Sequence, residues 1–116
     1  MLAIENAEAR DFLKRLPEIL PERPKAILMI SAHWERLRPG VNAPPHHETI
    51  HDFGGFPPAL YQLTYPAPGA PDVAQRAIEL LRAAGYAAEA DTQWGLDHGA
   101  WVPLMHLLPA AAVPVF

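Results

Sequence analysis

The stretch that decides the fold is "KAILMISAHWE", residues 25–35. Its first seven residues, 25–31, are mostly apolar, rich in Ile and Leu, and preceded by Pro24. A continuous apolar run of this kind predicts a strand that is buried on both faces, as in a parallel sheet. His33 then lies just past the carboxyl end of the strand, where ligands bind in open α/β sheets because the loops diverge there. His33 is therefore the first candidate for a ligand-binding side chain.

Helical periodicity appears in four other parts of the chain. The helix nearest the N-terminus has Asn6 as its predicted N-cap, and Pro17 is expected to end or kink it. The most strongly amphipathic helix is followed by Gly85 at its C′ position, which favours a left-handed C-cap. The predicted helices cover residues 6–20, 57–63, 71–84 and 99–108.

Two further segments, residues 86–91 and 111–116, are predicted to be short strands. Residues 36–56 are rich in Pro and Gly and show no period, which predicts a long loop. The order helix, strand, loop, helix, strand, helix, strand predicts an α/β fold with helices on both faces of a sheet. Because the last apolar strand runs up to Phe116, we expect the chain to be a fragment of a longer domain.

Composition limits the classes of function. A chain of 116 residues, 50% hydrophobic and 19% charged, is expected to form a single globular domain. The formal net charge of -4 leaves no basic face for nucleic acid, and the absence of cysteine excludes disulfides, thiolate nucleophiles and cysteine-bound zinc. No apolar stretch approaches the length of a membrane span, and the N-terminus lacks signal-peptide features. We therefore expect a cytoplasmic protein with no membrane partner.

Three predicted loops each carry a histidine with a carboxylate close by in the sequence. The pairs are His33 with Glu35, His51 with Asp52, and His98 with Asp97. Glu35 is expected to orient the ring of His33, and Asp52 to hydrogen-bond an imidazole beside it. Nitrogen and oxygen donors without cysteine fit non-haem iron or catalytic zinc. A histidine that only structures a turn would give the same pattern, and the residues alone leave the function open between an oxygenase and a hydrolase.

His98 is a candidate for catalysis, whereas His46, His47 and His106 carry less functional weight. His98 precedes a predicted helix, which suits a general base, although Asp97 would serve equally well as a simple N-cap. His46 and His47 are predicted to lie in a solvated loop. His106, among the leucines of the last helix, is expected to be a residue at the edge of the core with a satisfied ring.

Four motifs in order resemble one known family. They are "ISAHWE" (30–35), "TIHDFGGFP" (49–57), "LYQLTYPAPG" (60–69) and "GLDHGAWVPL" (95–104). Together they resemble the LigB superfamily of extradiol ring-cleaving dioxygenases, and in particular its 4,5-DOPA dioxygenase-like branch. The resemblance covers residues 1–116 and implies the N-terminal portion of a longer domain. The implied fold is a three-layer α/β sandwich with a central, mainly parallel or mixed sheet.

The resemblance also implies an activity and a set of site residues. The substrates would be a catechol and O2, and the cofactor a non-haem divalent metal, Fe(II) or Zn(II). His33 matches a metal ligand, His98 a catalytic histidine of the substrate pocket, and His51 a pocket histidine whose catalytic role is less defined. Met1 would end a motif whose histidine is another metal ligand, and the remaining ligand would follow Phe116. The fragment alone is therefore expected to be inactive.

Alternatives to this function stay open. The same imidazoles would suit a zinc-dependent hydrolase, and a member of the superfamily could instead act as a non-enzymatic metal-binding or protein-binding module. Self-association into a homo-oligomer is left open. Four aromatic residues would wall the substrate pocket or belong to the core: Trp34, Phe53, Phe56 and Trp101.

Overall fold

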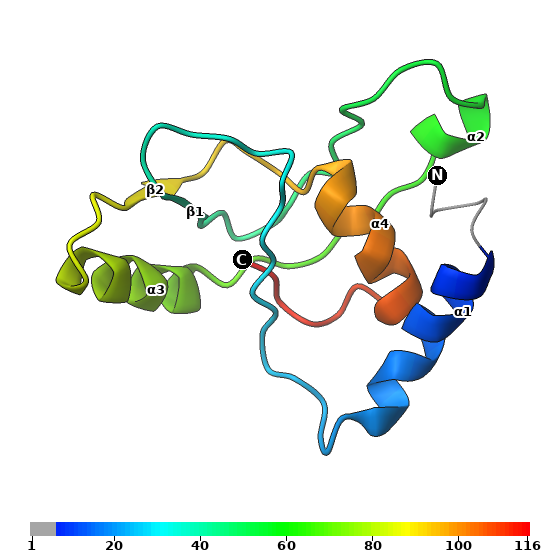
Figure 1. The fold of residues 1–116 in the computed structure, drawn as a ribbon, viewed down its shortest axis with the longest axis horizontal. Helices are drawn as coiled ribbons and strands as arrows, with labels where there is room; N and C mark the ends of the chain where they lie inside the picture. Colours follow the sequence, from blue (N-terminus) through cyan, green and yellow to red (C-terminus); the bar gives the residue numbers. More distant parts are fainter. Residues whose placement is uncertain (1–6) are drawn as a thin grey trace.

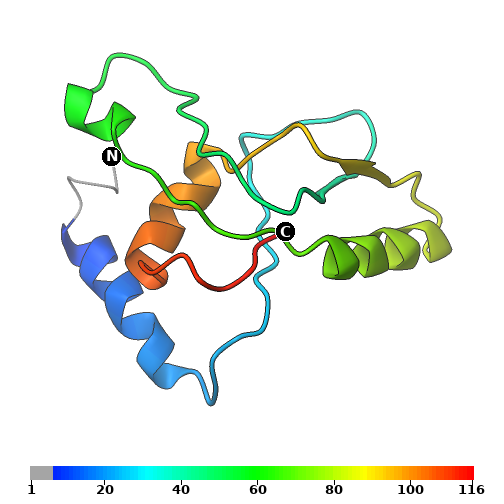
Figure 2. The same cartoon turned by 180° about the vertical axis from the view of Figure 1, so that it is seen from behind.

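Helices and short extended segments alternate along residues 7–116, the part of the chain that the computed structural model describes (Figure 1 and Figure 2). The elements are α1 (Ala7–Arg15), the 3-10 helix η1 (Leu16–Ile19), β1 (Gly40–Asn42), α2 (Pro58–Tyr61), α3 (Pro71–Ala83), β2 (Glu89–Asp91) and α4 (His98–Leu107). β1 and β2 pair in parallel, and α3 packs against this small sheet, while α1 packs against α4. The predicted α/β character is confirmed. Within residues 7–116, however, the assigned sheet has only two strands.

All four predicted helices are present. Pro17 lies in η1, so the first helix changes there from α to 3-10 geometry, as expected of a residue that lacks a backbone N–H. Gly85 adopts a φ of 97° directly after the C-cap of α3, as predicted. The expectations for Met1 and Asn6 lie outside the described residues. No helix within 7–116 combines the length and apolar character needed to cross a membrane.

The predicted strands at residues 25–31 and 111–116 do run side by side. Ile27 and Val115 form a parallel bridge, and Val115 makes a second one to Gly69. The N–H of Met29 donates to the carbonyl of Phe116 at 2.9 Å, which extends the pairing. Only these bridges form, without a full ladder, so neither segment is a regular strand.

The prediction that residues 25–31 are buried on both faces is wrong. Ile27 and Met29 pack against the core, whereas the alternate side chains of Leu28 and Ile30 are 60% and 85% exposed. Alternation is what an extended chain produces when only one face is covered. The uncovered face lines an open groove of about 750 Å³, to which Phe116 also contributes.

Strand β1 was missed by the sequence analysis, which predicted only loop over residues 36–56. The Arg36 guanidinium forms ion pairs with Glu89 and Asp91, both on β2, and so fastens the loop across the sheet. Burial opposes ionisation of Asp91, but two backbone N–H groups of the following turn and Arg36 outweigh it and hold its pKa below the usual value. A strand of three residues held by such distant contacts leaves little local signal.

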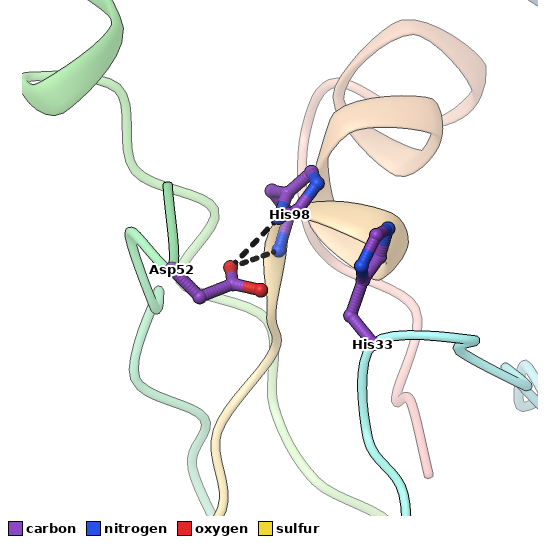
Figure 3. Close-up of side chains that lie close together, drawn as sticks. All are labelled: His33, Asp52 and His98. Atoms are coloured by element: carbon purple, nitrogen blue, oxygen red, sulfur yellow. Dashed lines mark hydrogen bonds and ion pairs between the residues drawn. The ribbon is translucent and has the colours of Figure 1, made fainter. Parts of the chain in front are cut away.

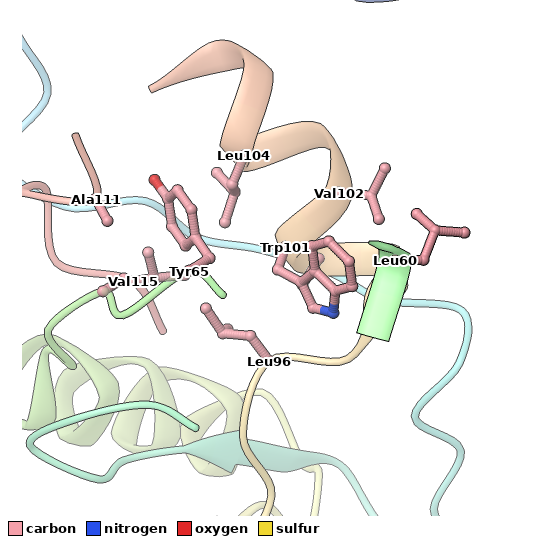
Figure 4. Close-up of a cluster of buried hydrophobic side chains, with 10 residues drawn as sticks. Leu60, Tyr65, Leu96, Trp101, Val102, Leu104, Ala111 and Val115 are labelled. Atoms are coloured by element: carbon pink, nitrogen blue, oxygen red, sulfur yellow. The ribbon is translucent and has the colours of Figure 1, made fainter. Parts of the chain in front are cut away.

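The main hydrophobic core forms around α4 (Figure 4). Trp101 is fully buried there, and its indole N–H donates to the carbonyl of Ile50 at 2.9 Å. The hydroxyl of buried Tyr65 donates to the carbonyl of Leu108 at the end of the helix, at 2.8 Å. His106 is buried on the same helix, as predicted for a residue of the core edge. Buried residues along α4 pack in the core and fix the helix. His98 is the first residue of α4, so its position is fixed as well.

The solvated-loop prediction is wrong for His47. His46 is exposed, but only 6% of the surface of His47 is accessible, and its Nε2 lies 2.6 Å from the carbonyl of Val115. Burial lowers the pKa of His47 from the ordinary value of 6.5, although the hydrogen bond to Val115 acts in the opposite sense. The neutral ring, protonated on Nε2, thus ties the loop to the C-terminal extended segment.

This burial predicts a loss of stability in acid. Because the folded pKa of His47 is depressed, the unfolded chain binds a proton more readily, and the free energy of unfolding should fall as the pH drops below 6.5. His47→Gln replaces the ring N–H by an amide N–H donor and cannot be protonated. The free energy of unfolding of this variant should therefore fall less between about pH 7.5 and about pH 5.5. Urea unfolding followed by tryptophan fluorescence measures the effect. His46→Gln, at the exposed neighbour, is the control and should change the slope much less; equal slopes for wild type and His47→Gln would contradict the prediction.

Candidate metal centre

The structure brings together His33, Asp52 and His98 (Figure 3). One ligand atom of each lies within 4.8 Å of the others, and the imidazole centroids of His33 and His98 are 4.0 Å apart. The three residues come from separate parts of the chain: the turn after residues 25–31, the loop before α2, and the first turn of α4. Figure 3 shows the ring of His98 between the carboxylate and the ring of His33.

Asp52 holds His98 through a single oxygen. The backbone N–H of His98 donates to Asp52 Oδ1 at 2.9 Å, and the ring Nδ1 of His98 lies 2.9 Å from the same oxygen. Burial opposes ionisation of Asp52, but the hydrogen bonds from the His98 backbone and ring outweigh it and hold the carboxyl pKa below its ordinary value. A carboxylate beside Nδ1 favours the proton on that nitrogen, which leaves Nε2 of a neutral ring as the basic atom.

His33 rests against the first turn of α4. Its backbone N–H donates to Ser31 Oγ at 3.2 Å, and the Ser31 hydroxyl donates to Asp97 Oδ1 at 2.5 Å. A Cβ on Gly99 would come within 2.5 Å of His33 Cδ2, so only glycine leaves room for the ring there.

Two carboxylates differ from their predicted roles, Glu35 wholly and Asp97 in its side chain only. Glu35 is exposed, and no contact within residues 7–116 joins it to the ring of His33. Asp97 occupies the N-cap position of α4, but its side chain makes no capping hydrogen bond. The oxygens of Asp97 are used by Ser31 and by the indole N–H of Trp94 instead.

His51 lies outside this cluster, among aromatic rings. Its Nε2 is 2.8 Å from the carbonyl of Leu63, and its ring centroid is 5.7 Å from that of Trp101. The neighbouring carboxylate of Asp52 reaches His98 rather than His51, since successive side chains of an extended segment point to opposite sides. His51 is therefore not one of the three clustered donors, although Phe53 contacts both His51 and His98.

The four aromatic candidates divide between core and surface. Trp101 is in the core, whereas Phe53 packs edge-on against His98, with centroids 5.6 Å apart. Phe56, 37% exposed, packs in turn against Phe53. Trp34 stacks on Trp94, with ring centroids 6.0 Å apart. Phe53 is therefore the aromatic residue of this set that adjoins the histidine pair.

The donor set fits a divalent metal. Two imidazoles and one carboxylate, close together and with part of their surface open to solvent, are the ligand types that non-haem Fe(II) and catalytic Zn(II) take. The family model described as "Catalytic LigB subunit of aromatic ring-opening dioxygenase" matches residues 5–116. The chain belongs to this family. The LigB resemblance inferred from the four sequence motifs is thereby confirmed, and LigB dioxygenases use a divalent metal.

Individual relatives agree with the LigB assignment. The chain is 47% identical to the 4,5-DOPA dioxygenase extradiol of Mirabilis jalapa over 96% of its own length and 42% of that protein. It is likewise 47% identical to the protein of that name from Escherichia coli (strain K12), again over 96% of this chain, but 40% of the relative. The crystal structure of the uncharacterized protein JW3007 from Escherichia coli K12 matches with a TM-score of 0.60 and 35% identity, covering 97% of this chain and 39% of that one. The chain thus spans less than half the length of these relatives.

Sequence reasoning did not connect two residues, Asp52 and Ser31, with His98 and His33. Asp52 was linked to its neighbour His51 and not to His98, and Ser31 was not considered at all. Asp52 carried a signal, since a carboxylate in a loop with His51 was already a candidate. Ser31 carried none, because a hydroxyl two residues before a histidine is common in turns.

Proposed function

We propose that the complete protein is an extradiol ring-cleaving dioxygenase that acts on a catechol with O2 and a divalent metal. The observation that carries this proposal is the cluster of His33, Asp52 and His98 within a chain that belongs to the LigB family. The relatives named as 4,5-DOPA dioxygenases support a catechol as substrate. Residues 1–116 would form one unit, the N-terminal portion of a longer three-layer α/β domain.

His33 is the metal ligand in this proposal. Its exposed ring and its attachment through Ser31 suit a fixed donor at the mouth of the site. A metal bound there would supply a Lewis acid to which a catechol and O2 can both bind. Catalytic sites of this kind need about three protein ligands and an open position, so further ligands would come from beyond this chain or from the same cluster.

His98 is the proton-transfer residue. With Nδ1 facing Asp52, the basic Nε2 can take a hydroxyl proton from the catechol and return it to the product. Asp52 fixes the orientation of the ring, because the same oxygen contacts both the backbone N–H and Nδ1 of His98. Phe53, edge-on to His98, offers an apolar surface for the aromatic substrate.

His51 is the second residue for which we propose a catalytic role. The neutral ring can donate from Nε2 to the carbonyl of Leu63, which leaves Nδ1 as the atom able to accept a proton. Its position among the rings of Trp101, Phe53 and Tyr61 supports a role where an aromatic substrate would pack, since Phe53 also contacts His98.

The test compares Fe(II) and Zn(II) in the protein expressed from its complete gene. Metal-free protein is loaded anaerobically with Fe(II), mixed with DOPA, and exposed to O2; we expect a yellow ring-opened product and uptake of O2 in equal amounts. The Zn(II)-loaded protein is the control and should give no product, because zinc has no redox chemistry. Hydrolysis of an ester by the zinc form, without ring opening by the iron form, would replace the proposal with a zinc hydrolase. Failure to bind either metal would favour a non-enzymatic module.

A further inference from the structure

A buried carboxylate joins the two histidine-bearing segments. Asp97 has only 1% of its surface exposed, although a carboxylate is costly to bury unless its oxygens are paired. Oδ1 accepts the Ser31 hydroxyl and Oδ2 the indole N–H of Trp94. Ser31 in turn accepts the backbone N–H of His33. A continuous path of hydrogen bonds therefore runs from α4 to the backbone of His33, between segments 66 residues apart.

Asp97 is also the residue directly before His98. Its backbone carbonyl accepts the N–H groups of Ala100 and Trp101, so its main chain begins α4 while its side chain holds Ser31. A displacement of Asp97 would therefore change the position of His33 relative to His98. Within residues 7–116, no other hydrogen bond joins the segment of Ser31 and His33 to the start of α4.

We infer that Asp97 is a positioning residue: it holds the His33 backbone at the start of α4, so it fixes the ligand His33 relative to His98 and, with it, the affinity of the site for a divalent metal. This inference rests on the proposed function for the role of the metal, but the position of the rings is independent of it. Asp97 touches neither ring, so it acts through Ser31 on one side and through the start of α4 on the other. Partners of this kind orient ligands, and their loss commonly weakens metal binding by about 10- to 100-fold.

Asp97→Asn is the main test in the protein expressed from its complete gene. The asparagine carbonyl can still accept Ser31, but its amide then faces the N–H of Trp94, donor against donor, and the network must rearrange. We expect affinity for Zn(II), measured by competition with a chromophoric chelator, to fall roughly 10- to 100-fold. We also expect the NMR cross-peak between the imidazole protons of His33 and His98 to weaken in the metal-free protein.

The matched control is Asp91→Asn, at the end of β2. Asp91 also accepts two backbone N–H groups at 2.8 Å and contacts Arg36, but it makes no hydrogen bond to Asp97, Ser31 or His33. It should lower the unfolding midpoint and leave metal affinity and the cross-peak unchanged. An Asp97→Asn protein that is less stable but keeps both the affinity and the cross-peak would overturn the inference.

Ser31→Ala covers the case in which Asp97→Asn fails to fold. It removes only the hydroxyl, so the fold should survive, and affinity and cross-peak should change in the same direction as for Asp97→Asn. Unchanged values would overturn the inference. If wild-type protein binds no metal, the proposed function fails, yet the cross-peak in metal-free protein still decides whether Asp97 positions the two rings.

Discussion

His33→Ala is expected to abolish stoichiometric metal binding, whereas His98→Ala should keep the metal and lose turnover. The first change removes the proposed ligand, and the exposed loop that carries His33 contains no second histidine to replace it. The second removes proton transfer at Nε2 but leaves Ser31 and His33 in place, so we expect turnover to fall by roughly 100- to 10,000-fold. Metal content after gel filtration and steady-state rates with DOPA measure the two effects.

His46→Ala is the control for this pair of variants. It removes an exposed imidazole outside the cluster, and should change neither metal content nor rate. Full metal occupancy in His33→Ala would remove the ligand assignment. Loss of metal from both His33→Ala and His98→Ala would instead make the two histidines, with Asp52, a common ligand set, and His98 could not then serve as the free base.

The sequence predicted those parts of the fold that depend on nearby residues. The helix at residues 71–84 follows from its period and from Gly85, and the structure has α3 over Pro71–Ala83. His33, after an apolar extended segment, and His98, at a helix start, were each predicted as candidates because α/β folds bind ligands at such places, and the structure brings the two rings together. Both predictions rest on residues close together in the sequence, and both agree with the structure.

What the sequence could not predict depends on distant contacts. Strand β1 depends on ion pairs between Arg36 and residues of β2, and no pattern within residues 36–56 predicts these ion pairs. The apolar side chains of residues 25–31 predict burial, but they do not show which face of the segment is covered within residues 7–116. Leu28 and Ile30 lie on the uncovered face and are exposed. Asp52 could have served either of two histidines, and only the direction of its side chain decides for His98.

Because the ring of His33 is exposed, its position depends on the few groups that contact it. Asp52 and Phe53 contact His98, but the ring of His33 lies against His98 on one side and the backbone of Gly99 on another. Its backbone is held through Ser31. A change that adds a single carbon beneath the ring therefore tests whether the metal site needs this close approach.

Gly99→Ala is that change. The new Cβ would lie 2.5 Å from His33 Cδ2 and 2.7 Å from Ser31 Oγ, so the ring and hydroxyl must move, while the helical backbone itself accepts alanine. Alanine favours a helix over glycine by about 1 kcal/mol, which should offset much of the clash and keep the unfolding free energy within about 1 kcal/mol of wild type.

Metal affinity should respond much more strongly than stability to Gly99→Ala. A displacement of His33 of about 1 Å is enough to lower turnover by roughly 100-fold, and metal affinity should fall at least about 10-fold. Chelator competition and urea unfolding on the same samples separate the two effects. Gly54→Ala is the control, since a Cβ there meets nothing within 4 Å. If Gly99→Ala binds metal as tightly as Gly54→Ala, metal binding does not require the contact between the His33 ring and Gly99. The site would then not depend on the close packing of His33 against the first turn of α4.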